Sequence, residues 1–172
     1  MARIAILFAS TWGHTRAIAE RLGAAAGARG AEVALHDLGA GDPGVPDADR
    51  LVLVGAVYSN EHHAALVGWL RVHRGELAGR DVRLVSSSLA IALGTDEGEG
   101  AAWDYVGELE QLTGVKLREV TLVAGALAES RYDPSTRALL RVASWRAGLG
   151  TTGDDVFTDW SQVDAIGAKL AG

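Results

Sequence analysis

A cluster of hydroxyls beside a glycine, at the junction of two elements, has the chemistry to bind an anion. In ILFASTWGHTRAIAERL (residues 6–22), an apolar run stops at Ser10 and a helix-like pattern begins after Gly13. Hydroxyls at Ser10, Thr11 and Thr15 and the free N–H groups of a helix N-terminus can all donate hydrogen bonds, and Gly13 permits close approach. These neutral donors predict a phosphate monoester site without a cation. The alternative is that Ser10 or Thr11 only caps the helix.

Other phosphate and metal motifs are missing from the sequence. There is no Gly-Lys-Ser/Thr, as nucleoside triphosphate loops require, and no three-glycine dinucleotide fingerprint. The acidic stretch of residues 96–99 lacks the ligand order of a calcium loop, so we expect a solvated loop there and no metal site.

Strand-like and helix-like runs alternate along the chain, which predicts an α/β fold with a parallel sheet covered by helices on both faces. We expect strands over residues 3–9, 32–38, 50–57, 82–88 and 117–126. Helices are expected after the first strand and over residues 62–77, 101–112, 134–149 and 161–170. The run of residues 50–57 is the most apolar and is expected to be central.

Ligands of such sheets bind at the carboxyl ends of strands, where the strand order reverses. The predicted site therefore lies after the first, third and fourth strands. Besides the first loop, it would contain Ala56, Val57, Tyr58, Ser59, Asn60, Ser87, Ser88, Leu89 and Ala90. For the serines, the alternative is an ordinary strand end.

Composition sets further limits on the class of protein. With 172 residues and 48% hydrophobic content, the chain is expected to form a single domain, residues 1–172. The formal charge of −6 argues against nucleic-acid binding. There is no Cys, so redox chemistry must come from a cofactor. The first apolar run is too short for a signal peptide and no run reaches membrane-spanning length, so we expect a cytoplasmic protein.

The first loop resembles that of the flavodoxins, which reads T/S-x-T-G-x-T and binds FMN. Ser10, Gly13 and Thr15 match, whereas Trp12 replaces the middle Thr. The resemblance implies FMN as cofactor, with Trp12 and His14 also in its phosphate loop and His14 directed at water. It implies that the segments around Tyr58 and Ser87 flank the flavin ring, with Tyr58 able to stack on it.

Four longer segments resemble the flavodoxin-type, menaquinone-dependent protoporphyrinogen oxidases. They are LVLVGAVYSNEHHAALVGWL, SSSLAI, LVAGALAESRY and VFTDWSQVDAIGAKLA. The likeness covers essentially the whole chain. It implies a flavodoxin-like three-layer sandwich with five parallel strands in the order 2-1-3-4-5. An insert, about residues 128–153, would interrupt the fifth strand.

The resemblance implies an FMN oxidoreductase that passes a hydride from a porphyrinogen-like substrate to flavin N5 and then reduces a quinone. His63, Tyr58 and Arg131 are the catalytic candidates. His62 and His63 are otherwise expected to be partly solvated at a helix start, and Arg131 could simply hold the insert. The alternatives are a flavodoxin-type electron carrier and an NAD(P)H-dependent flavin or quinone reductase.

The insert carries an apolar stripe among arginines over residues 134–149. Such a helix can lie on an anionic membrane surface, where a quinone would be found, which implies peripheral contact with the inner face of the cell membrane. Alternatively, it covers the sheet edge or forms a subunit interface, which implies a homodimer.

Overall fold

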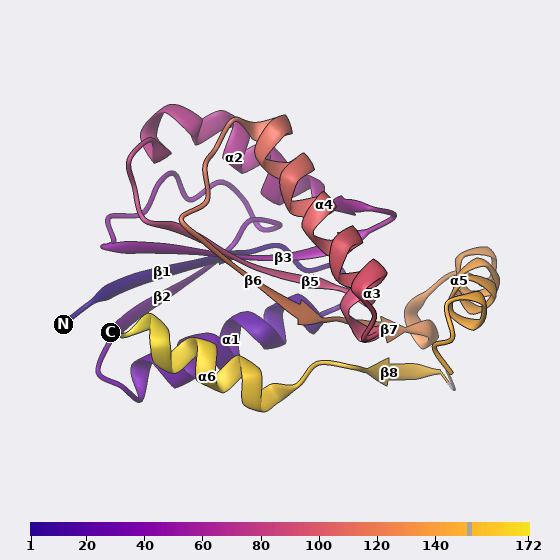
Figure 1. Cartoon of the computed structure of the whole chain (residues 1–172). Helices are drawn as coiled ribbons and strands as arrows, with labels where there is room; N and C mark the ends of the chain where they lie inside the picture. Colours follow the sequence, from indigo (N-terminus) through magenta and orange to yellow (C-terminus); the bar gives the residue numbers. More distant parts are fainter. Residues whose placement is uncertain (151–152) are drawn as a thin grey trace.

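A computed structural model describes residues 1–150 and 153–172. Its main sheet is parallel and confirms the predicted strand order. In spatial order the strands are β2 (Glu32–Asp37), β1 (Arg3–Phe8), β3 (Arg50–Tyr58), β5 (Val82–Ser88) and β6 (Glu119–Ala124). All their carboxyl ends lie on the right in Figure 1. The strand order reverses between β1 and β3, so a crevice opens at that edge.

Helices cover both faces of the sheet, giving the predicted three-layer sandwich (Figure 1). One layer contains α1 (His14–Gly27) and α6 (Trp160–Leu170), and the other contains α2 (Ala64–Leu77) and α4 (Asp96–Thr113). Each layer buries one apolar stripe against the sheet, such as Ile18 and Leu22 of α1, which are both fully buried. No helix among the described residues has the length and hydropathy needed to cross a bilayer.

The segment after β3 differs from the prediction. Ser59 and Asn60 take positive φ angles of 49° and 69°, and the chain folds back as β4 (Glu61–His62), antiparallel to β3. Helix α2 therefore begins at Ala64, with His63 as its N-cap. Residue His62, predicted to be partly solvated at a helix start, is instead buried with 5% of its surface exposed. A two-residue strand has no periodicity from which it could be detected.

The acidic segment of residues 96–99 is also not the solvated loop we expected. A short helix, α3 (Leu89–Ala92), follows β5, and α4 begins at Asp96 with Thr95 as its N-cap. The Thr95 hydroxyl accepts a hydrogen bond from the Gly98 N–H at 3.1 Å. Acidic residues in a first helical turn interact favourably with the positive end of the helix dipole, which accounts for this composition.

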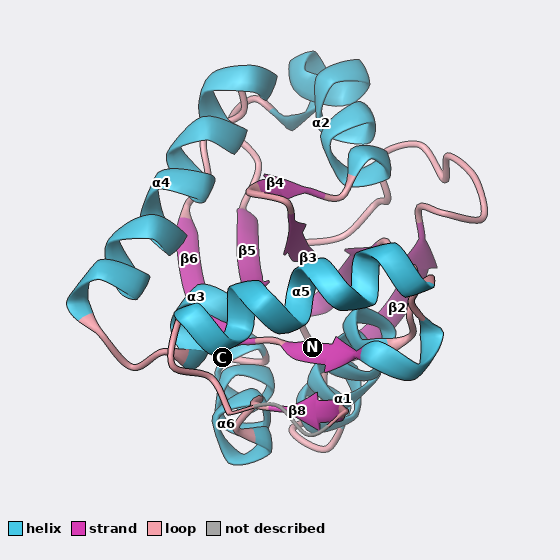
Figure 2. Cartoon of the chain, turned by 90° about the vertical axis from the view of Figure 1, so that its right-hand side faces the viewer, coloured by secondary structure: helices cyan, strands magenta, loops and turns pink. Residues whose placement is uncertain are grey.

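The insert leaves the main sheet rather than covering its edge. After β6, residues Ala126–Ala128 form β7, which pairs antiparallel with β8 (Asp154–Val156) as a separate ribbon. Between them lie a 3₁₀ turn, η1 (Glu129–Arg131), and α5 (Pro134–Arg146). The end-on view in Figure 2 shows α5 lying across the carboxyl ends of the strands. Residues 151–152 of the predicted insert lie outside the described residues.

Candidate functional site

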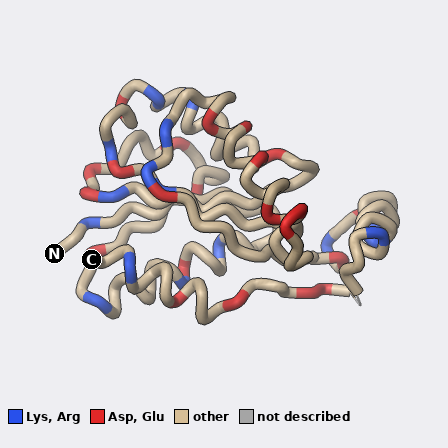
Figure 3. Tube along the Cα trace, in the orientation of Figure 1, with Lys and Arg blue, Asp and Glu red and all other residues tan. Residues whose placement is uncertain are grey.

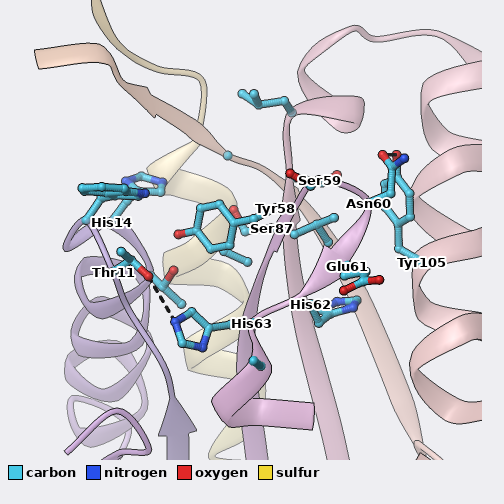
Figure 4. A pocket seen from close by; sticks show the side chains of 18 of the residues that line it. Thr11, His14, Tyr58, Ser59, Asn60, Glu61, His62, His63, Ser87 and Tyr105 are labelled. Atoms are coloured by element: carbon cyan, nitrogen blue, oxygen red, sulfur yellow. Dashed lines mark hydrogen bonds between the residues drawn. The ribbon is translucent and has the colours of Figure 1, made fainter. Parts of the chain in front are cut away.

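A cleft of about 890 Å³ lies at the predicted edge of the sheet. Its walls come from the loop before α1, the β3–β4 hairpin, the end of β5, α2, α4, β7 and α5. The volume is near the upper end of the range for small-molecule sites. Figure 4 shows how the polar side chains converge on it.

Most of the residues predicted to bind a cofactor line this cleft. They are Thr11, Trp12, His14, Thr15, Ala56, Val57, Tyr58, Ser59, Asn60, Ser87, Ser88 and Leu89. Ser10, Gly13 and Ala90 are not part of its lining. Ser10 and Gly13 shape the loop, and Ala90 packs against α4, where its carbonyl oxygen would lie 2.3 Å from a Cβ at Gly98.

Residues 10–15, called the phosphate loop below, form a tight turn into α1. The Gly13 N–H donates to Ser10 Oγ at 3.0 Å, and Gly13 takes a φ of 92° that favours glycine. The N-cap of α1 is Gly13, and no side chain of the described residues caps this helix. The alternative that Ser10 or Thr11 caps the helix is therefore wrong. The first N–H groups of α1 have no side-chain acceptor in the described part of the chain.

Among the described residues, two buried hydroxyls that line the cleft have no hydrogen-bond partner. They are Thr15 Oγ1, in a residue only 1% exposed, and Ser88 Oγ, in a residue 4% exposed. Leaving a buried hydroxyl unpaired costs about 1–3 kcal/mol, so native structures seldom contain one without a reason. Each hydroxyl belongs to a segment predicted to hold the cofactor, and a bound ligand with polar atoms would satisfy it.

His63 presets the direction of the Thr11 hydroxyl. The Ala65 N–H donates to His63 Nδ1 at 3.2 Å, so the neutral imidazole carries its proton on Nε2. That nitrogen lies 3.1 Å from Thr11 Oγ1, the contact drawn in Figure 4. Thr11 therefore accepts from His63 and keeps its own O–H proton available for an anion.

Tyr58 occupies the centre of the cleft in Figure 4, with its ring 6.3 Å from that of His63. Burial raises the pKa of the Tyr58 phenol, so it is neutral at physiological pH. The Thr15 hydroxyl lies near the Tyr58 phenol and partly opposes this rise in pKa, although the two groups are not aligned as a hydrogen bond. An aromatic face and a neutral hydroxyl are thus both presented to a planar ligand.

His14 does not point into water, contrary to the prediction. Its Nε2 lies 2.8 Å from Thr158 Oγ1, and its ring meets Trp160 edge-on at 5.7 Å. Thr158 donates to the Ala124 carbonyl at 2.6 Å, so it accepts from His14. Burial lowers the pKa of His14, which is therefore neutral. Thr158 and Trp160 thus hold His14 of the phosphate loop in place. Because Thr158 and His14 are 144 positions apart, no local sequence pattern reveals this contact.

Arg131 connects the insert to the phosphate loop, as in the alternative that it holds the insert. Its side chain is exposed, does not line the cleft, and donates a hydrogen bond to the Trp12 carbonyl of the phosphate loop. The adjacent Tyr132 is buried and meets the Trp12 ring edge-on at 5.2 Å. Trp12, which replaces the usual hydroxyl, thus packs against the insert.

Sequence reasoning missed the outer part of the cleft. Its walls there are Val67 of α2, Leu109 and Leu112 of α4, and Leu139 and Leu140 of α5. Tyr105 of α4 donates to Asn60 Oδ1 at 3.0 Å and joins this wall to the β3–β4 hairpin. The only signal in the sequence was the helical spacing of apolar residues, which core packing explains equally well.

Comparison with known proteins decides the family. The family model described as flavodoxin domain matches residues 5–152. The chain belongs to the flavodoxin family. Proteins of this family bind FMN. A search of curated proteins gives no significant match.

Solved structures similar to this flavodoxin-family chain share its fold. A short-chain flavodoxin associated with a non-canonical PDU bacterial microcompartment is 12% identical over all of both chains, with a TM-score of 0.54. Two-electron reduced Megasphaera elsdenii flavodoxin is 23% identical over 69% of this chain and 84% of its own, with a TM-score of 0.53. An NAD(P)H:quinone oxidoreductase from Methanothermobacter marburgensis is 22% identical over 86% and 96%, with a TM-score of 0.51.

Proposed function

We propose that this protein binds FMN in the cleft and is an FMN-dependent oxidoreductase of the quinone-linked protoporphyrinogen oxidase type. The observation that supports FMN binding most directly is the pair of buried, unpaired hydroxyls of Thr15 and Ser88. Thr15 belongs to the phosphate loop and Ser88 to the segment expected at the flavin ring, so the two fit opposite parts of one ligand. When bound, FMN supplies the hydride and electron chemistry.

The chain's own residues hold and orient this cofactor. The N–H groups of α1 and the hydroxyls of Thr11 and Thr15 would bind the phosphate, while Ser10 holds the shape of the loop. Tyr58 would stack on the ring, and the backbone at Ser87, Ser88 and Leu89 would pass along its polar edge. His63 is a neutral imidazole beside Tyr58 and fixes the Thr11 hydroxyl.

The enzyme proposal, rather than an electron carrier, is supported by the outer cleft. A carrier needs an exposed flavin edge that protein partners can approach. Here α5 lies across the strand ends (Figure 2). Leucines of α4 and α5 line the cleft. Such walls suit a large, mainly apolar substrate such as a porphyrinogen or a quinone. The carrier and the NAD(P)H-dependent reductase are the competing outcomes of the test.

One anaerobic experiment separates these functions. Purified protein is loaded with FMN and divided into two samples. One sample is mixed with protoporphyrinogen and the other with NAD(P)H, while the flavin absorbance of each is followed. Bleaching by protoporphyrinogen and recovery with a menaquinone analogue is the expected result. Bleaching by NAD(P)H alone would favour the reductase. Colourless protein that takes up no FMN at micromolar concentration would overturn the proposal.

Deletion of residues 135–148 tests the part played by α5. We expect FMN still to bind, because no phosphate-loop residue is removed, but more weakly, because the contacts of Arg137 with the Glu129 and Tyr132 carbonyls are lost. Quinone-linked turnover should be lost. Unchanged turnover would contradict the enzyme proposal and favour the carrier.

We further propose that α5 contacts the inner face of the cell membrane, where a quinone substrate is dissolved. Leu139, Val142 and Trp145 are 70%, 50% and 78% exposed, and α5 carries arginines and no acidic residue (Figure 3). Co-sedimentation with anionic vesicles should fall in Trp145→Ser and Leu139→Ser variants. If the vesicles sediment without the wild-type protein and gel filtration gives a dimer, α5 is a subunit interface instead.

A further inference from the structure

The phosphate loop leaves the charge of a bound phosphate unbalanced by its own residues. A helix N-terminus supplies about half a positive charge, and the hydroxyls are neutral. Trp12 stands where the family pattern has a third hydroxyl. The nearby histidines are neutral, since His14 is partly buried against Thr158 and His63 accepts at Nδ1. Arg16 is paired with Asp37.

Arg131 places a guanidinium directly over this loop. It donates to the Trp12 carbonyl, and its Nη1 lies 3.5 Å from the position that a Cβ on Gly13 would take. Its partner there is a neutral carbonyl, and among the described residues no carboxylate lies within ion-pair distance of it. The pKa of the nearby Asp154 carboxyl is lowered mainly by its hydrogen bonds to Ser130 and further by the charges of Arg131 and Arg137, so this carboxylate already has partners of its own. A guanidinium has five N–H donors, so most remain available for an anion in the same loop.

The base of the insert holds Arg131 in this position. Arg137 donates to the Glu129 carbonyl at 2.9 Å and to the Tyr132 carbonyl at 3.0 Å, which fixes both ends of η1. The Ala128 N–H donates to the Tyr132 hydroxyl at 3.1 Å, and the Tyr132 ring packs on Trp12. The chain therefore directs Arg131 toward the loop through a side-chain network.

We infer that Arg131 is a phosphate ligand of FMN, supplied by the insert in place of the hydroxyl that Trp12 removes. This inference rests on the proposed FMN site and goes beyond it, because the loop residues alone supply no cation. It also gives Trp12 a role, since the insert contacts both its carbonyl and its ring. The cofactor's phosphate then joins η1 to the phosphate loop.

The inference is tested by comparing FMN with riboflavin, which lacks the phosphate. Dissociation constants are measured by quenching of flavin fluorescence for the wild type, Arg131→Met and Arg131→Lys. We expect Arg131→Met to bind FMN at least tenfold more weakly and riboflavin equally well. Arg131→Lys should recover part of the lost FMN affinity, because the ammonium keeps the positive charge but lacks the paired N–H donors of the guanidinium. The FMN affinity of the wild type should fall more steeply with salt than that of Arg131→Met.

Arg146→Met is the matched control, because it removes the same charge from an exposed position at the far end of α5. It should leave both affinities unchanged. Far-ultraviolet circular dichroism and the melting temperature of each ligand-free variant establish that the fold is retained. Hydrogen exchange supplies a second readout, since FMN should protect residues 129–132 in the wild type more than riboflavin does.

Several outcomes would overturn the inference, and they can be told apart. An equal loss of FMN and riboflavin affinity would make Arg131 a structural residue of the insert. Unchanged FMN affinity in Arg131→Met would exclude the phosphate contact while leaving the FMN site intact. Failure of the wild type to bind FMN would overturn the proposed function, and this inference with it.

Discussion

The two buried threonines Thr15 and Thr113 differ in whether the fold itself supplies a hydrogen-bond partner for the hydroxyl. Thr15 Oγ1 has no partner, whereas Thr113 Oγ1 donates to the Leu109 carbonyl at 2.7 Å. Thr15→Val should weaken FMN binding about tenfold, since a hydrogen bond to a charged oxygen contributes roughly 1.5–3 kcal/mol, and should not destabilise the ligand-free protein. Thr113→Val should instead cost about 1 kcal/mol without changing FMN affinity. Flavin titration and urea unfolding measure the two effects, and a stability loss in Thr15→Val would contradict this account.

His62 makes the stability of the fold depend on pH. Its Nε2 lies 2.9 Å from Ser86 Oγ, and burial lowers its pKa to about 4. The unfolded chain takes up this proton near pH 6.5, whereas the folded protein does not. Stability is therefore fully present above pH 6.5 and decreases as the pH falls toward 4, by roughly 3 kcal/mol in all.

The His62→Asn variant isolates this contribution, because an amide can still bond Ser86 but does not titrate. The unfolding free energy of the wild type minus that of the variant should fall by roughly 3 kcal/mol from pH 7 to pH 4 in urea titrations. His14 and His73, whose pKa values are lowered and raised, contribute equally to both proteins. If this difference in unfolding free energy did not change with pH, His62 would take up a proton as readily in the folded protein as in the unfolded chain.

At the scale of elements, the packing of α3 on α4 positions the segment after β5. A Cβ at Gly98 would lie 2.3 Å from the Ala90 carbonyl oxygen, whereas nothing lies within 4 Å of a Cβ at Gly100 in the same helix. Gly98→Ala should destabilise the protein by about 1–3 kcal/mol and weaken FMN binding by displacing Leu89. Gly100→Ala should stabilise it by up to about 1 kcal/mol. Thermal unfolding of both variants checks this, and equal effects would contradict this account of the α3–α4 packing.

Elements with a long, regular apolar pattern could be predicted from the sequence. The strand over residues 82–88 is found with the expected bounds. The strand expected over residues 50–57 extends one residue further, to Tyr58, and it is the nearly continuous apolar run that a buried parallel strand produces. The two-residue β4 and the early start of α4 could not be predicted, since turn geometry and an N-cap decide them. The apolar stripe of α5 was visible, but helical spacing does not tell which partner covers it, and Val142 and Trp145 are exposed.

At the scale of the whole molecule, ligand binding and folding are linked. FMN at one hundred times its dissociation constant should raise the unfolding free energy by about 2.7 kcal/mol. For a chain of this size that corresponds to roughly 5–10 °C in melting temperature. Adenosine monophosphate, which offers a phosphate without the flavin ring, should give a much smaller shift in the same thermal scan. Equal shifts would mean that the ring is not bound.

The candidate site was largely predictable where it depends on strand ends, because topology alone brings the loops after β1, β3 and β5 together. The contacts of Arg131 with Trp12 and of His14 with Thr158 join residues more than 100 positions apart. Nothing in the local sequence specifies such pairs. They depend on the path of the insert and of the chain that follows it.

The β3–β4 hairpin has a consequence for how molecules enter and leave. Strand β4 is hydrogen-bonded to β3, and β3 lies inside the main sheet. The cleft wall that carries Tyr58 therefore cannot move outward without breaking hydrogen bonds of a central strand. The opposite wall, α5, is carried by the narrow β7–β8 ribbon. We therefore expect ligands to enter and leave the cleft on the side of the insert. The residence time of a bound ligand should depend on the rigidity of the β7–β8 ribbon rather than on the stability of the domain.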